Sequence, residues 1–356
     1  MAGKRLIAGS CWLAVATVLL ATGAAQAAIT IETVPVGNVG NDGELSGDGA
    51  GGFGPDRICG AVAYSYNIGK YEVTAGQYTA FLNAVAKTDA YGLYNAYMDT
   101  SVHNYYGCNI QRTGTSGSYS YSVAPDWANR PVNYVSWGDS ARFSNWLHNG
   151  QPTGAQGLGT TEDGAYFLTG AMSNAALLAV NREADWKWAI TGEDEWYKAA
   201  YHENDGVTGN YFDYPTVSDS TPSNDLVTPD GGNNATFYAS GYTIGSPYYR
   251  TEVGEHENSE SPYGTFDQGG NVWEWNEAII SDAGASYRGL RGASFTYGEE
   301  CLLASMRIIS SYPSSESASF GFRVSEVPEP ATMSLLAAGL AALLVRRRWA
   351  GPLSPP

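Results

Sequence analysis

The residues best suited to do chemistry lie in a nine-residue segment, 267–275, with the sequence Asp-Gln-Gly-Gly-Asn-Val-Trp-Glu-Trp. Its two carboxylates, Asp267 and Glu274, stand seven positions apart on either side of a glycine pair. Glycine allows backbone conformations that can turn carbonyl oxygens toward a common centre. Calcium takes about six to eight oxygen ligands at roughly 2.3–2.6 Å and mixes carboxylates with carbonyls. The segment therefore favours a calcium site, with an acidic turn that holds no metal as the alternative.

Other familiar catalytic spacings are absent from the sequence. There is no G-x-S-x-G, no H-E-x-x-H and no G-x-x-x-x-G-K-[ST]. The four histidines, His103, His148, His202 and His256, are scattered, and none pairs with another four residues away. A two-histidine, one-carboxylate iron site would have to be assembled by the fold, so no copper or iron is expected from these spacings.

Both ends of the chain indicate export. Lys4 and Arg5 precede an apolar stretch, 6–20, and Ala25-Gln26-Ala27 is an A-x-A cleavage site. We therefore predict a signal peptide at 1–27, with an uncleaved N-terminal helix as the alternative. The mature chain then starts near Ala28, and a single domain follows at 28–327.

The C-terminal segment, 328–356, has a three-part order. Pro-Glu-Pro at 328–330 is followed by an apolar run, 331–345, and then by three arginines. This order resembles the PEP-CTERM sorting signal of Gram-negative bacteria that make exopolysaccharide. The resemblance implies membrane arrest through this segment and processing by an exosortase, and the alternative is an ordinary membrane anchor. Either way we expect a cell-envelope protein, anchored or released to the surface or matrix.

The net charge of the chain excludes one class of binding partner. Without both terminal signals, 14 basic and 35 acidic residues remain, a net charge near −21. Such a surface excludes binding to nucleic acid, which requires clustered Lys and Arg.

The cysteines predict one disulfide bond. Beyond the signal peptide the chain has Cys59, Cys108 and Cys301. The odd count predicts one disulfide and one free thiol, and we expect the bridge between Cys59 and Cys108, which flank one predicted helix.

Three capping boxes mark the helices that must position these residues. Each has a Ser or Thr followed three residues later by an acid or amide. They begin at Thr74, Ser136 and Thr191, and each leads into apolar residues on one stripe. Short strands are expected at 64–68 and 321–324. The spans between are rich in glycine, above all 203–262, so the predicted class is α+β with little regular secondary structure.

Six segments, in order, resemble the formylglycine-generating enzyme (sulfatase-modifying factor) family and cover about residues 60–325. They are Ile-Gly-Lys-Tyr-Glu-Val-Thr at 68–74, Pro-Val-Asn-Tyr-Val-Ser-Trp at 131–137, Glu-Asp-Glu-Trp-Tyr-Lys-Ala-Ala at 193–200, Gly-Asn-Val-Trp-Glu-Trp at 270–275, Arg-Gly-Ala-Ser-Phe at 291–295 and Gly-Phe-Arg-Val at 321–324. The resemblance implies a C-type-lectin-like core that binds calcium. Its calcium ligands fall on Asp267, Gly270, Val272 and Glu274. A second calcium, with Asn233 or Asn234, would lie within 230–265.

The catalytic residues of the family do not carry over. Family oxidases bind copper(I) through two cysteines five residues apart, after the segment that resembles 291–295. Here Tyr297 occupies the first position, and the second falls near Leu302, with Cys301 one residue away. Cys301 is thus the one weak catalytic candidate, with a small buried thiol as the alternative. The iron-ligand string H-x-x-x-H-x-E of some relatives is also absent.

Two classes of function follow from these observations. The first is a surface or matrix protein without formylglycine-generating activity that binds extracellular polysaccharide or matrix. The alternative is a metal-dependent oxidase, of formylglycine-generating or non-haem iron type, acting on an exported substrate. Aromatic rings suit sugar faces, and tyrosines are dense at 91–121 (Tyr91, Tyr94, Tyr97, Tyr105, Tyr106, Tyr119, Tyr121). These tyrosines form either a binding platform or part of the core. Arg291, Arg307 and Arg323 are expected to tie loops to carboxylates and carbonyls.

Overall fold

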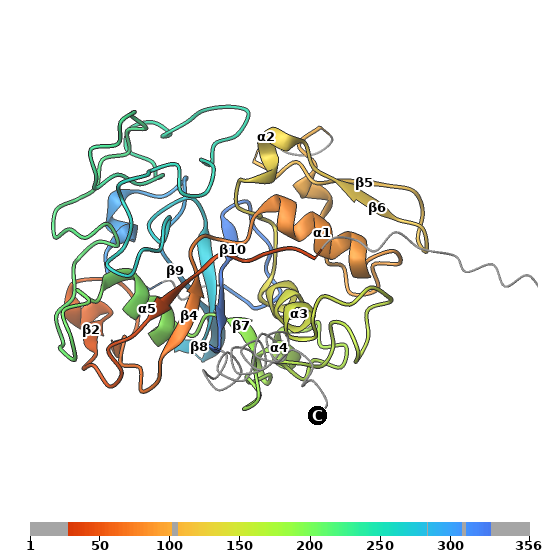
Figure 1. Ribbon diagram of the computed structural model, residues 1–356, viewed down its shortest axis with the longest axis horizontal. Helices are drawn as coiled ribbons and strands as arrows, with labels where there is room; N and C mark the ends of the chain where they lie inside the picture. The colour runs from red at the N-terminus through yellow and green to blue at the C-terminus, as the bar shows by residue number, and fades with distance from the viewer. Residues whose placement is uncertain (1–27, 102–105, 283, 308–310, 329–356) are drawn as a thin grey trace, which may run out of the picture.

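A computed structural model describes residues 28–101, 106–282, 284–307 and 311–328 (Figure 1). The predicted signal peptide and the apolar run at 331–345 lie outside the described residues. The predicted class, α+β with little regular structure, is confirmed: short strands and helices are joined by long irregular segments.

Two small sheets lie at the centre of the fold. The first is antiparallel, in the order β1 (Thr33–Val36), β4 (Tyr66–Gly69), β11 (Val324–Glu326), β7 (Trp188–Ile190). The second has β8 (Trp273–Asp282) between β9 (Ala285–Arg291) and β10 (Phe320–Phe322), with β8 and β10 parallel. Two further pairs are β2 (Glu44–Ser46) with β3 (Arg57–Cys59) and β5 (Gln111–Thr113) with β6 (Ser120–Ser122). The strands expected at 64–68 and 321–324 are present, but the second is split at Arg323.

The predicted capping boxes locate the helices well. Thr74 caps α1 (Ala75–Val85) and Ser136 caps α3 (Trp137–His148), each with the reciprocal bonds of a capping box. The third prediction was wrong by one residue. Gly192, not Thr191, precedes α5 (Glu193–Tyr201), and its N–H donates to the Glu195 carboxylate at 2.7 Å. The other helices are short: α2 (Pro125–Ala128), α4 (Asn174–Leu178) and the 3-10 turns η1 (Asp48–Ala50), η2 (Ala96–Met98) and η3 (Glu299–Leu302).

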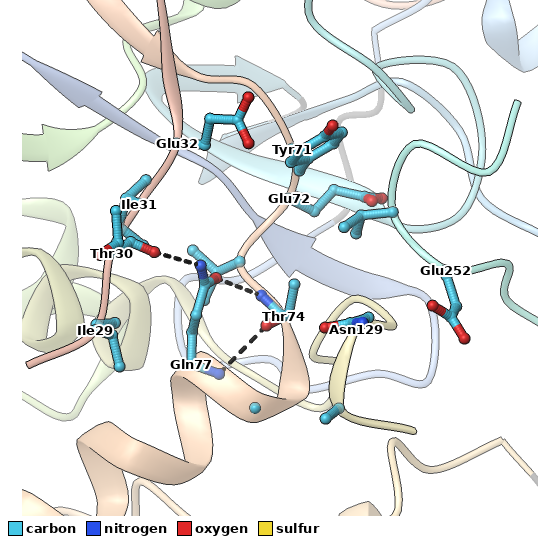
Figure 2. A pocket seen from close by; sticks show the side chains of 14 residues that line it. Ile29, Thr30, Ile31, Glu32, Tyr71, Glu72, Thr74, Gln77, Asn129 and Glu252 are labelled. Atoms are coloured by element: carbon cyan, nitrogen blue, oxygen red, sulfur yellow. Dashed lines mark hydrogen bonds between the residues drawn. The ribbon is translucent and has the colours of Figure 1, made fainter. Parts of the chain in front are cut away.

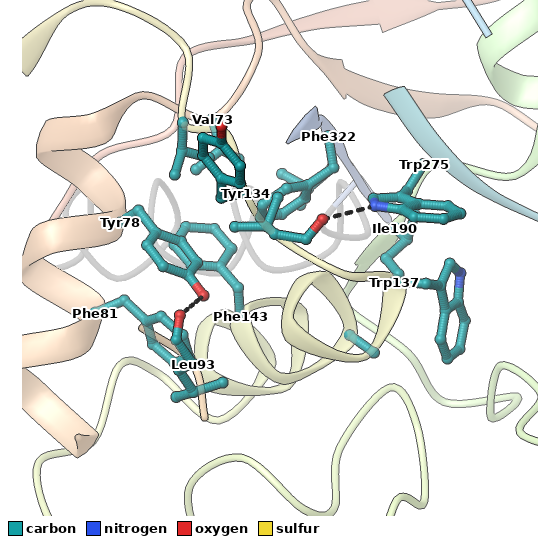
Figure 3. Packing of buried hydrophobic residues seen from close by; sticks show 14 of the residues in the cluster. Val73, Tyr78, Phe81, Leu93, Tyr134, Trp137, Phe143, Ile190, Trp275 and Phe322 are labelled. Atoms are coloured by element: carbon teal, nitrogen blue, oxygen red, sulfur yellow. Dashed lines mark hydrogen bonds between the residues drawn. The ribbon is translucent and has the colours of Figure 1, made fainter. Parts of the chain in front are cut away.

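The main hydrophobic core lies between α1, α3 and the sheets (Figure 3). Phe143 on α3 is at its centre and packs edge-on against Phe81 of α1 and Phe322 of β10. Trp273 and Trp275 are both buried in this core, and the Trp275 ring N–H donates to the Val135 carbonyl at 2.9 Å. The second sheet is therefore anchored at the end where the candidate site begins.

The expected disulfide between Cys59 and Cys108 is wrong. Cys59, Cys108 and Cys301 all have free thiols. Cys59, at the end of β3, is buried in a small cluster with Trp196 and Tyr197, whereas Cys108 is buried in the main core. Cys108 therefore behaves as a small apolar residue, the usual role of a buried thiol, whereas the Cys59 sulfur also accepts a hydrogen bond from Arg291 at 3.3 Å.

Candidate functional site

The segment 267–275 forms a tight turn that leads directly into β8. Three of its residues have left-handed backbones, with φ of 59° at Asp267, 95° at Gly270 and 52° at Asn271. A Cβ atom on Gly270 would lie 2.2 Å from the Thr236 carbonyl oxygen, so no larger residue fits there without a shift of the backbone. The glycine that the sequence placed between the two carboxylates is thus required by both conformation and space.

Glu274 is fully buried and its carboxylate is bound on both oxygens. Arg323, also fully buried, donates from Nε to Oε2 at 2.6 Å and from Nη2 to Oε1 at 2.7 Å. The Trp196 ring N–H donates to Oε2 at 2.7 Å. Glu274 therefore joins α5, β8 and the linker between β10 and β11 through short charge-assisted hydrogen bonds.

Asp267 lies at the start of the same turn. Its Oδ2 accepts the Gly254 N–H at 2.6 Å, which ties the turn to the segment 252–254. Burial raises the pKa of Asp267 to about 6, an effect that Arg323 opposes and Glu274 reinforces.

Glu72, between β4 and α1, supplies a third carboxylate to this region. Burial is the main cause that raises its pKa well above the ordinary value, and the nearby Asp267 and Glu274 carboxylates add to it. Its Oε1 is buried without any hydrogen-bond partner. Glu72, Asp267 and Glu274 therefore lie near one another, with the buried Arg250 and Arg323 guanidinium groups beside them. Calcium at Asp267, Gly270, Val272 and Glu274 stays a prediction.

A pocket of about 610 Å³ opens beside Glu72 (Figure 2). Its walls come from the N-terminal segment 29–32, the start of α1 and the segments 128–129 and 252–253. Gln77 closes one side, because its side chain donates to the Thr30 carbonyl and accepts from the Thr74 N–H. Glu32, Glu72 and Glu252 also line it, but Glu32 is paired with Lys70 at 2.8 Å and Glu252 lies 3.9 Å from Arg130.

The positions that correspond to the copper-binding cysteines do not form a thiolate pair. Tyr297 is 38% exposed, whereas Leu302 is fully buried in the core. Cys301 is partly buried on η3, and burial, with a smaller effect from Glu300, raises the pKa of its thiol to about 11.

Five aromatic rings contact one another in a group made of Tyr106, Tyr238, Tyr242, Tyr249 and Phe295. Tyr297 is joined to this group through the Tyr238 backbone, and we name the six residues the tyrosine patch. Phe295 is buried beneath it, with the Tyr106 ring centroid 5.5 Å away. Tyr242 lies 5.1 Å from Tyr249 and 5.3 Å from Tyr238, measured between ring centroids. The Tyr238 N–H donates to the Tyr297 carbonyl at 2.9 Å, which fixes the two exposed residues together.

The tyrosines that the sequence grouped at 91–121 do not form one platform. Tyr94 and Tyr121 are buried, and the Arg112 guanidinium lies over the rings of Tyr94 and Tyr119. Tyr91 covers Arg142, Tyr97 stacks on Tyr134, and Tyr105 lies outside the described residues. Of this group only Tyr106 joins the tyrosine patch, whose other members are distant in sequence and carried no local signal.

A family model for the sulfatase-modifying factor enzyme 1-like domain matches residues 27–327. The chain belongs to this family. A second model, the PEP-CTERM protein-sorting motif, matches residues 326–348. The sulfatase-modifying-factor domain is thus part of an exported protein that an exosortase processes, as predicted. Over the described residues no helix is both long and apolar enough to cross a membrane.

Several solved structures are similar to this sulfatase-modifying-factor domain at low identity. Treponema denticola variable protein 1 is 17% identical, with 84% of this chain and 98% of that chain covered and a TM-score of 0.49. CarF is 16% identical, with coverage of 84% and 99% and a TM-score of 0.48. PvdO from Pseudomonas aeruginosa is 20% identical, with coverage of 77% and 84% and a TM-score of 0.42. Among curated proteins, none matches the chain significantly.

The arginines of the family segments act as predicted. Arg291 and Arg307 both bind the buried Glu193 carboxylate, at 2.8 and 2.9 Å, and also donate to backbone carbonyls. Arg323 donates to the carbonyls of Gly69 and Phe266 besides Glu274. These guanidinium groups therefore tie the loops of the sulfatase-modifying-factor domain to one another.

The remaining metal candidates of this domain are held in protein hydrogen bonds. Asn234 donates to Asp230, whose carboxylate also accepts from the N–H groups of Gly232 and Asn258. The Thr216 hydroxyl donates to the Asn233 side-chain oxygen at 2.6 Å. A second calcium site at either asparagine stays a prediction. In the described ranges, no group of three or more His, Cys, Asp or Glu side chains is arranged to hold a metal ion. His103 lies outside those ranges.

Proposed function

We propose that this protein is a binding protein of the cell envelope that holds neutral saccharide chains on the tyrosine patch and does not generate formylglycine. The observation that supports the proposal is the position of Tyr297. A tyrosine stands where an oxidase of the family would have its first copper ligand, and this exposed residue is joined through the backbone to the exposed Tyr238.

The chemistry of the tyrosine patch suits sugars. Tyr238 and Tyr242 are 42% and 36% exposed, so their rings are available to stack on the apolar faces of pyranose units. Their hydroxyls provide hydrogen bonds at the rim, as in the contact of 3.2 Å between the Tyr106 and Tyr242 oxygens. Stacking and hydrogen bonding on one surface are the two interactions that a saccharide chain requires.

The charge of the protein selects among saccharides. A mature chain with a net charge near −21 repels uronate-rich or sulfated polymers. Neutral polysaccharides are not repelled in this way, so we infer that the ligand is an uncharged chain. Before processing, the segment 331–345 would hold the protein at the membrane, and exosortase cleavage would transfer it to the surface or matrix.

We also propose that the protein holds one structural calcium ion at the turn 267–275. Asp267, Glu274 and the backbone carbonyls of Gly270 and Val272 would supply the oxygens. The ion would brace the turn that leads into β8, whose Trp273 ring packs 5.4 Å from Tyr297. Calcium would thereby support the tyrosine patch from below.

Affinity electrophoresis tests the saccharide proposal. The exported protein would be run through native gels containing dextran, galactomannan or the polyanion alginate. We expect retardation by a neutral polymer and none by alginate. Tyr242→Ala and Tyr297→Ala should weaken retardation about 5-fold or more, whereas Phe167→Ala, which removes a ring 55% exposed outside the patch, should not. Retardation that is equal in all variants, or absent in every neutral gel, would refute the proposal.

A further inference from the structure

We propose that the exosortase docks on the folded domain itself, in a groove beside the end of β11, through a positively charged surface of its own. The inference concerns the processing of the chain and is independent of the saccharide proposal. It begins from the place where the sorting motif starts. The match to that motif covers residues 326–348, so its first residue, Glu326, is also the last residue of β11.

The strand that carries the start of the motif is fixed inside a sheet. β11 lies between β4 and β7, and Glu326 pairs with Asn67 on one side and Trp188 on the other. Val324 and Ser325 are fully buried. Peeling β11 away would break both ladders and open the core, and core strands open only at free energies close to that of global unfolding. β11 therefore stays in the domain while the motif is processed.

The fixed part of the chain ends where the Pro-Glu-Pro triplet begins. The Val327 N–H donates to the Lys187 carbonyl at 2.9 Å, one residue beyond β11. Pro328 has no N–H and cannot continue this pairing. The triplet 328–330 spans at most about 10 Å even when it is fully extended. An enzyme that acts on the triplet must therefore approach the surface of the domain around Val327 and Lys187.

A groove of about 420 Å³ opens at this surface. The Lys187 N–H donates to Nδ1 of His148 at 3.1 Å, and His148, the last residue of α3, lines the groove. α3 lies beside β7 in Figure 1. The groove and the end of the sheet thus form one surface. We name it the processing face and define it by six lining residues, His148, Leu158, Asp163, Phe167, Glu183 and Asp185.

The processing face is acidic. Asp163, Glu183 and Asp185 are all exposed. Burial lowers the pKa of the half-buried His148, and Lys187 adds to this effect, whereas Asp185 and Asp163 oppose it. The imidazole is therefore mostly neutral at pH 7, and the three carboxylates dominate the charge of the face, with Lys187 at its edge. Positive charge on a partner would steer its approach and fix its orientation.

The same face has apolar side chains that favour a protein partner over lipid. Leu158 and Phe167 are 60% and 55% exposed. Exposed apolar groups with polar groups around them are typical of protein contact sites. Anionic lipid headgroups, in contrast, would be repelled by the three carboxylates. The chemistry of the face therefore fits a basic, partly apolar protein surface, brought to this place by the sorting motif.

Processing of the full chain in cells that produce the exosortase tests this surface. Pulse-chase labelling would follow the conversion of the precursor to its shortened form. Glu183→Lys combined with Asp185→Lys should slow processing at least ~5-fold, because like charges then oppose the approach of the enzyme. The matched control, Glu257→Lys with Glu260→Lys, makes the same change of charge at two exposed positions that do not line the groove. It should stay within about 2-fold of the wild type, since distant surface charges are screened.

A longer tether separates a local contact from a general defect in export. A Gly-Ser linker of about eight residues after Val327 adds roughly 15 Å of mean reach. The enzyme can then act on the triplet without approaching the processing face, so the double lysine change should slow processing by less than about 2-fold in this background. A delay that stays equally large with the linker would count against the proposal.

The rate in the double lysine variant decides between the partners. Processing at the wild-type rate would overturn the proposal. Faster processing would overturn it as well, and would indicate that anionic lipid contacts this face instead. Should the double lysine variant not fold, Glu183→Gln with Asp185→Asn removes both charges without reversing them. An unchanged rate in this folded variant would equally contradict docking at the processing face.

Discussion

Replacing Glu274 with alanine tests the structural centre of the site. The change removes three short hydrogen bonds and leaves the fully buried Arg323 guanidinium without its carboxylate. Breaking one partner of a buried ion pair costs about 3–5 kcal/mol. For a domain of about 300 residues, with an unfolding entropy of roughly 2.1 cal/mol/K per residue, this corresponds to a fall in Tm of about 5–8 °C.

Calorimetry and urea unfolding of the exported protein would measure this loss. The control is Glu326→Ala, which removes a partly exposed carboxylate that accepts one bond from Asn67 at 3.1 Å. It should cost less than about 1 kcal/mol. If Glu274→Ala costs no more than this control, the buried Glu274–Arg323 pair does not hold the turn in place and the reasoning is refuted.

Three further predictions concern the Cys301 thiol, the turn at Gly270 and the stability of the protein at acid pH. Cys301→Ser should change the free energy of unfolding by less than about 1 kcal/mol, since we expect the thiol to act only as a small packing group. A larger decrease, measured by urea denaturation, would contradict this. Gly270→Ala should lower it by about 2 kcal/mol or more, because the new Cβ meets the Thr236 carbonyl at 2.2 Å, and an unchanged Tm would count against the turn geometry. Burial alone would raise the Glu193 pKa, but its arginine partners hold it at about 2, below the ordinary 4.5. This carboxylate therefore stabilises the fold above pH 4.5 and loses that effect as the pH falls toward 2. In Glu193→Gln, the urea midpoint of unfolding should therefore fall less steeply as the pH is lowered through this range. An equal fall in both proteins would disprove the stabilising role of the Glu193 carboxylate.

Local signals in the sequence predicted the framework well. Thr74 and Ser136 cap their helices because a capping box involves residues only three positions apart. The third helix began one residue late, since the Gly192 N–H can be satisfied by Glu195 without a side-chain cap. Arg323 was predicted to tie loops together, and it does so while splitting the expected final strand in two.

The parts of the site that the sequence did not reveal depend on contacts between distant segments. Glu72 meets Asn271 across about 200 positions, and nothing in its own segment distinguishes it from a solvent-exposed acid. The tyrosine patch brings Tyr106 beside Tyr242 and Tyr249, whereas the other described tyrosines at 91–121 contact separate neighbours, among them Arg112, Arg142 and Tyr134. Cys59 and Cys108 flank one helix in sequence, yet the fold buries them in separate clusters.

The most direct test of the account is elemental analysis of the exported protein, purified without chelator and desalted. A binding protein with a calcium-braced turn and no copper thiolate pair should contain close to one calcium per chain and no stoichiometric copper or iron. Near-stoichiometric copper or iron would contradict the account and would support an oxidase that uses Cys301.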